Sequence, residues 1–397
     1  MKGPTPRRLL KYVAGPLGLS RYLKEPGDGR PQPKIPAKAL LWGLLIGELL
    51  REHSFLAIEA LAGSRVRSNL GLSRSFGDDA LAYFTERLDP ALTRTALAAT
   101  LHKAKRNKAF DGSRFIGLVV DGTGAGRSRV GGCDFCRPFH NARKEVAGYH
   151  HKLVMISVAG TGLSLPCDVE PYGPGDSEYA AGQRLLRRAV ANLGVRFADY
   201  VVVDGGFATA PFLHAAGEVG LPVVARLKEN LPELLATAQK RFHSQAPHLS
   251  FQNGKDRVEI WDADDFDPWE TLRWETVRVF MYRQHKPDGK VIEALWLTNC
   301  KTSKVGSRSL FQIAKSRWEI ENQGFNDAKN RYGMEHICHH HPNSMLIGWL
   351  LIALALTIER LYRLRYLHRG NHPVKTAIEL VRLLWFSLDR TSTANTT

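Results

Sequence analysis

The spacing of hydrophobic residues changes near residue 110, and this change divides the chain into a helical part and an α/β part. From 37 to 108, apolar residues recur at three-to-four spacing, with turn signals at Gly71 and at Asp89-Pro90. This pattern predicts an all-helical domain at 37–110. Residues 1–36 are rich in proline, glycine and basic residues, and predict a loosely ordered arm.

Beyond residue 110, short apolar runs alternate with amphipathic segments. The run at 115–120 predicts a buried strand that stops at Asp121. Further strands are predicted at 152–158, 163–169, 200–203 and 222–225. Helices are predicted at 178–193, 209–219, 309–330 and 344–369. Strands that alternate with helices predict an α/β sheet.

The alternation of strands and helices in the α/β part is interrupted once by a β-rich segment. Alternating β-type residues at 249–299 predict a β-rich insertion, at about 226–300, within an α/β domain at 111–370. The residues from 371 to 397 are expected to form a C-terminal helix and a polar tail.

The charge balance indicates a polyanionic partner. The 397 residues include 55 Lys and Arg against 39 Asp and Glu, a net charge of +16. Neutralised phosphates supply most non-specific nucleic-acid affinity, so DNA is the expected partner; a merely soluble basic protein is the alternative. The 44% hydrophobic content argues against wholesale disorder.

Cysteine usage and apolar run lengths give the expected location. Five scattered cysteines are too few for a disulfide framework in a chain of this length. No apolar segment of a signal peptide follows the basic N-terminus, and the apolar runs at 39–50 and 346–358 are short for a bilayer. The expected location is therefore cytoplasmic, with no membrane partner.

Two predicted strands end in an aspartate followed by glycine, at Asp121 and Asp204. Functional groups gather at the carboxyl ends of strands in open α/β sheets, and glycine lets a ligand approach the backbone. The alternative is that each Asp-Gly pair only makes a turn.

A third acid comes from the geometry of the helix at 309–330. At about 100° per residue, Glu321 lies roughly 50° from the centre of the apolar stripe and Glu319 roughly 110° away. A carboxylate beside a buried face needs a cation or a metal, so Glu321 is the candidate and Glu319 is expected to be a solvated surface charge.

Together, Asp121, Asp204 and Glu321 would hold two Mg²⁺ or Mn²⁺ ions about 3.5–4 Å apart. Arg317 and Lys329 lie on the same helix as Glu321, at positions suited to DNA phosphates. The other interpretation of Arg317 and Lys329 is that they form pairs within the helix.

At these residues the chain resembles the DDE transposases of bacterial insertion sequences, in the group with a tyrosine-arginine-glutamate-lysine signature and a β-rich insertion. The matching stretches are Val119-Val120-Asp121-Gly122-Thr123, Val202-Val203-Asp204-Gly205, and Arg317-Trp318-Glu319-Ile320-Glu321-Asn322-Gln323-Gly324-Phe325-Asn326. Trp296-Leu297-Thr298-Asn299 is similar to the family's last strand before the catalytic helix. The resemblance covers about 110–358.

The resemblance implies a ribonuclease H-like core with a β-rich insertion, preceded by a helical domain and followed by C-terminal helices. It also implies catalysis by Asp121, Asp204 and Glu321, with Arg317 and Lys329 on DNA phosphates. The expected activity is metal-dependent cleavage of 3′ strands at the element's terminal inverted repeats and transfer into target DNA. A homodimer that synapses two DNA ends would carry it out.

The signature is matched with two departures. Ala314 stands where the family has tyrosine, and seven residues rather than six separate Glu321 from Lys329. One extra residue rotates a side chain by about 100° on a regular helix. We therefore predict a π-bulge near Gly324, since such bulges are frequent at functional sites.

Two alternative functions remain open at this stage. One is a ribonuclease H-like nuclease without strand transfer, and the other is a catalytically decayed DNA-binding protein descended from a transposase. The presence of all three acids argues against decay.

A separate group of cysteines and histidines has the spacing of a metal site. Cys133 and Cys136 form a C-x2-C pair in a glycine-rich loop, and Cys338 and His340 follow the helix of Glu321. Together they could supply a tetrahedral zinc site. The alternative is that the histidine run is a polar loop that contacts phosphate or water.

Overall fold

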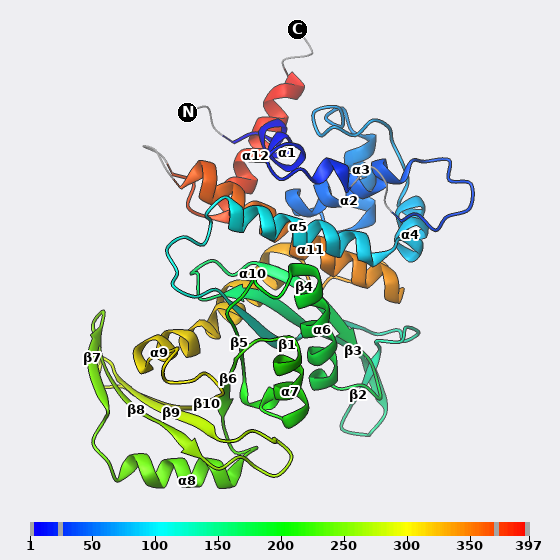
Figure 1. Ribbon diagram of the computed structural model, residues 1–397. Helices are drawn as coiled ribbons and strands as arrows, with labels where there is room; N and C mark the ends of the chain where they lie inside the picture. Colours follow the sequence, from blue (N-terminus) through cyan, green and yellow to red (C-terminus); the bar gives the residue numbers. More distant parts are fainter. Residues whose placement is uncertain (1–3, 23–26, 369–372, 394–397) are drawn as a thin grey trace.

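The computed structural model describes residues 4–22, 27–368 and 373–393. It consists of a large mixed sheet with helices on both faces and a helical layer across one end, drawn at the top of Figure 1. The helical layer contains α1 (Pro6–Ala14), η1 (Leu19–Arg21), α2 (Ala37–Leu50), α3 (Phe55–Gly63), α4 (Asp78–Arg87), α5 (Pro90–Arg106), α11 (Pro342–Tyr362), η4 (Arg363–Leu367) and α12 (Ala377–Thr393).

The helical layer combines the first and last parts of the chain. Its helices begin at local signals: Ser54 caps α3 through its hydroxyl, and Asp89 caps α5 ahead of a proline at the first position. The apolar helix α11 packs against α2, α4 and α5, so the N-terminal helices share a core with the C-terminal ones.

The apolar helix α11 continues directly into η4. Within the described residues, Pro342–Leu367 is the segment long and apolar enough to cross a membrane by length and composition, and its most apolar window is 89% buried inside the protein.

The expected loosely ordered arm differs from the structure at 6–14. Thr5 caps α1, which buries Leu9, Tyr12 and Val13. The Tyr12 ring lies 5.4 Å from the ring of Tyr362, so α1 packs on the end of α11. The sequence did not predict α1, because its apolar face is confined to one short helix. Residues 1–3 and 23–26 of the arm lie outside the described residues.

Over the described residues, the sheet has ten strands in the order β2-β3-β1-β5-β6-β10-β9-β8-β7, with β4 also paired to β3. The strands are β1 (Gly117–Ser128), β2 (Arg137–His140), β3 (Val146–Ala159), β4 (Pro166–Tyr172), β5 (Tyr200–Val203), β6 (Val223–Leu227), β7 (Leu249–Asn253), β8 (Asp256–Phe266), β9 (Val277–His285) and β10 (Val291–Thr298). The antiparallel trio β4-β3-β1 followed by parallel β5 and β6 makes a ribonuclease H-like core.

The β-rich insertion extends this sheet instead of forming a separate one. β10 pairs antiparallel with β6, Leu295 opposite Leu227, and β9, β8 and β7 follow outward. The insertion also contains α8 (Pro232–His243), which contacts β8. The expected strand at 296–299 corresponds to the end of β10.

Strand β1 does not stop at Asp121 as expected; it continues to Ser128. Its parallel partner β5 ends with Val203 opposite Val120, whereas its antiparallel partner β3 continues, with Met155 opposite Asp121. Asp121 therefore lies at the point where β1 loses one of its two neighbours, and the glycines after it are held by β3.

Helices cover both faces of the core. On one face lie α6 (Glu178–Leu193) and α7 (Ala210–Glu218), with the turn η2 (Gly205–Phe207) between β5 and α7; on the other lies a helix interrupted in its middle. This interrupted helix consists of α9 (Ser307–Ser316), the π-helical turn η3 (Ile320–Phe325) and α10 (Asn326–Tyr332). The predicted π-bulge near Gly324 is confirmed.

Gly126 provides a test of how β1 docks against the end of α10. Its φ is +110°, and a Cβ there would lie 2.6 Å from the carbonyl oxygen of Glu335. We expect Gly126→Ala to lower the free energy of unfolding by about 1–3 kcal/mol, because it combines backbone strain with overpacking. Urea denaturation measures the change.

Gly124→Ala is the matched control in the same strand. A Cβ at Gly124 would meet no heavy atom within 4 Å among the described neighbours. Equal destabilisation by the two alanine variants would show that the contact with Glu335 is unimportant.

Candidate active site

Asp121 projects from β1 toward the interrupted helix and is half-buried. One carboxylate oxygen accepts the Gly122 N–H at 2.9 Å, and the other accepts Arg317 Nη1 at 3.2 Å. Burial is the main cause that raises the pKa of Asp121 to about 6; the charges of Glu321 and Asp204 add to it, whereas the charge of Arg317 and the Gly122 hydrogen bond oppose it. The other two expected acids, Asp204 and Glu321, are therefore both close enough to act electrostatically on Asp121.

Asp204 follows β5 directly. Its carboxylate forms a 2.8 Å ion pair with Lys228 Nζ. Burial alone would raise the pKa of Asp204, but the hydrogen bond from Lys228 and the charges of Arg317 and Lys228 outweigh it and the pKa is lowered. Asp204 is thus held as a carboxylate.

Lys228 was not expected from the sequence. It follows the last residue of β6, at the same edge of the sheet as Asp204. The signal that could have found it is positional: it comes directly after a strand that runs parallel to β5.

Glu321 lies in η3, with its side chain 43% exposed. Arg317 Nη2 donates to its carboxylate at 2.6 Å, and the same guanidinium reaches Asp121. The Arg317 side chain is only 4% exposed and lies over the Trp318 ring at 4.1 Å. DNA phosphate could reach Arg317 only if these ion pairs rearranged.

Glu319 is not the solvated charge that the sequence predicted. Its carboxylate accepts the Gly160 N–H at 3.2 Å in the β3–β4 hairpin, and burial raises the pKa of Glu319 to about 7. It also interacts with Tyr200, which pairs with Gly117 at the start of β1, before Asp121. Glu321, not Glu319, therefore shares Arg317 with Asp121.

Lys329 lies beyond the three acids along the interrupted helix. Its ammonium group forms a 3.1 Å ion pair with Glu335, and the side chain is 27% exposed. The backbone of Glu335 lies against Gly126, so Lys329 is near the far part of β1.

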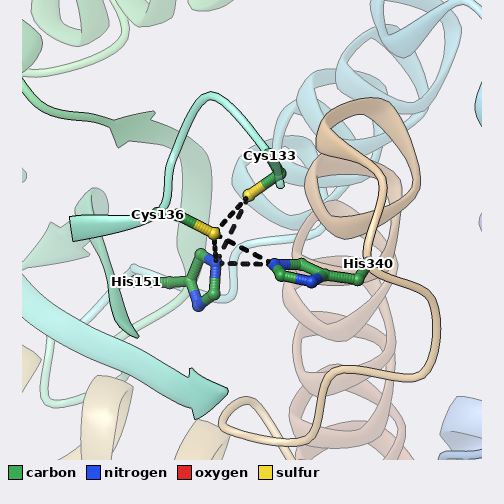
Figure 2. Close-up of side chains that lie close together, drawn as sticks. All are labelled: Cys133, Cys136, His151 and His340. Atoms are coloured by element: carbon green, nitrogen blue, oxygen red, sulfur yellow. Dashed lines mark hydrogen bonds between the residues drawn. The ribbon is translucent and has the colours of Figure 1, made fainter. Parts of the chain in front are cut away.

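Three of the four predicted metal ligands come together, and His151 takes the place of Cys338. Cys133 and Cys136 meet His340, and His151 of β3 completes the cluster (Figure 2). The expected ligand Cys338 is exposed and lies beside Glu48 in a different pocket. The chain bends at Cys338 and at the residue after it, and so His340 but not Cys338 faces the cluster.

Comparison with known proteins gives one family match. The model of the transposase DDE domain matches residues 112–358. Among solved structures, the cryo-EM structure of a piggyBac transposase synaptic complex with hairpin DNA is similar, with a TM-score of 0.44 and 12% identity over 97% of this chain and 80% of that one. No curated protein sequence matches the chain.

Proposed function

The chain belongs to the family of transposases with a DDE domain, and we propose that it cleaves the 3′ strands at insertion-sequence ends and transfers them into target DNA. The observation that carries this proposal is that Arg317 donates to both Asp121 and Glu321, while Asp204, paired with Lys228, is close enough for its charge to act on Asp121. The three acids come from β1, the end of β5 and η3.

The residues present fit a site for divalent cations. Each of the three carboxylates already forms an ion pair, with Arg317 or with Lys228, so the site attracts positive charge. Carboxylate oxygens are also the ligands that Mg²⁺ and Mn²⁺ prefer. Two such ions would be held by Asp121, Asp204 and Glu321. When bound, they would activate a water or a 3′-hydroxyl and stabilise the leaving oxygen.

The chain's own side chains contribute in other ways. Arg317 donates to both Asp121 and Glu321 and so connects β1 with η3. Lys228 donates to Asp204 and orients its carboxylate. Lys329, partly exposed beside the far part of β1, is placed to contact a DNA phosphate if it leaves Glu335.

The net charge of +16 supports double-stranded DNA as the partner, both the element's inverted repeats and the target. Joining two ends at one target requires two active sites, so we propose a homodimer in the synaptic complex.

Strand transfer tests the proposal directly. The substrate is a short duplex that carries the DNA flanking the coding sequence and ends in a pre-cut 3′-hydroxyl. We expect the purified chain with Mg²⁺ or Mn²⁺ to join it to a supercoiled plasmid. Cleavage without joining would indicate a nuclease, and metal-independent DNA binding without cleavage would indicate a decayed transposase.

A further inference from the structure

Four side chains that the proposed chemistry does not use converge on one point at the junction of the catalytic core and the helical layer. They are Cys133 and Cys136 from the β1–β2 loop, His151 from β3, and His340 from the segment between α10 and α11 (Figure 2). One donor atom of each lies within 4.8 Å of all the others.

The distances between these donor atoms are close to the edges of a tetrahedron around zinc. With Zn–S near 2.3 Å and Zn–N near 2.0–2.1 Å, a tetrahedral ion separates its ligand atoms by roughly 3.3–3.8 Å. Cys133 Sγ and Cys136 Sγ are 3.3 Å apart, and His151 Nε2 lies 3.4 Å and 3.5 Å from them. His340 Nε2 is 3.2 Å from Cys136 Sγ and 3.3 Å from His151 Nε2.

The orientation of the rings also fits a common ion. The imidazoles of His151 and His340 are nearly perpendicular, at 85°; His151 turns Nε2 toward both sulfurs, and His340 turns Nε2 toward the sulfur of Cys136. Both cysteines and His151 are buried, and His340 is half-buried. Two thiolates and two neutral imidazoles form the donor set that zinc prefers in closed sites.

The loop that carries the cysteines is held independently of the cluster. A Cβ at Gly173 would lie 1.9 Å from the carbonyl oxygen of Asp134, so the β4–α6 turn packs directly on this loop. Arg137 donates to the Gly173 carbonyl at 2.7 Å. The thiols are therefore positioned before any ion binds.

We propose that Cys133, Cys136, His151 and His340 bind one structural Zn²⁺ ion. Four protein ligands leave no open position, which is typical of structural zinc sites and not of catalytic ones. His340 follows Cys136 by 204 positions, so the ion closes a long loop of chain. It ties the segment that leads into α11 to β3, and thereby holds the connection from the helix of Glu321 to α11.

Metal content of the full-length chain tests the proposal without any measurement of DNA chemistry. We expect about one zinc per chain by elemental analysis after purification without chelator. Cys133→Ser and His151→Asn are expected to lose most of it. Cys338→Ser is the matched control, because this neighbouring cysteine lies outside the cluster, and it is expected to keep its zinc.

Cobalt binding by the wild-type chain removes the dependence on whether variants fold. After zinc removal, added Co²⁺ is expected to give thiolate charge-transfer bands and intense visible bands of a tetrahedral site, both abolished by equimolar Zn²⁺. Wild-type chain without zinc that takes up no Co²⁺, or a Cys133–Cys136 disulfide in freshly purified protein, would overturn the proposal.

Discussion

Replacement of Glu321 with glutamine is expected to reduce plasmid nicking and strand transfer by at least about 10³-fold, the scale seen when one member of a catalytic group is removed. The reason is that glutamine keeps the size of Glu321 and its acceptor for Arg317 but removes the negative charge beside Asp121. DNA binding, measured by mobility shift, should change little.

Glu319→Gln is the matched control, two residues away in the same helical segment. Glu319 accepts a backbone N–H of the β3–β4 hairpin, and glutamine retains that acceptor. Its pKa near 7 means that the neutral form is already populated at neutral pH. Activity should therefore remain close to that of the wild type. An equal loss of activity in both variants would show that Glu321 is not part of the active site.

The sequence predicted the elements whose signals are local. The helix at 178–193 and the strand at 200–203 have the predicted bounds, because capping and apolar spacing lie within each segment. The π-helical turn was also predictable, because the extra residue between Glu321 and Lys329 had to be absorbed somewhere.

The features that the sequence missed depend on partners far along the chain. β1 continues past Asp121 only because β3 pairs with it. Glu319 is partly buried because a hairpin 159 positions away donates to it. His151 was not expected as a ligand, since its place beside the cysteines depends on the register between β2 and β3. Neither periodicity nor spacing specifies such pairings.

A buried ion network between α5, β4 and α6 leads to the largest expected change in stability. Asp168 on β4 is 1% exposed and accepts Arg94 Nε at 3.0 Å and Arg188 Nε at 2.6 Å. Asp168→Ala would leave both guanidinium groups without this partner in a poorly solvated position. We expect the free energy of unfolding to fall by about 3–5 kcal/mol, measured by urea denaturation.

Asp265→Ala is the matched control for this prediction. Asp265 also pairs with an arginine, Arg241, at 2.6 Å, but the two side chains are 62% and 35% exposed. Solvent screens that pair, and its loss should cost no more than about 1 kcal/mol. If Asp168→Ala costs as little as Asp265→Ala, the network does not hold α5 and α6 to the sheet. Their position would then depend on apolar packing alone, since α5 and α6 contact each other and β4 as well.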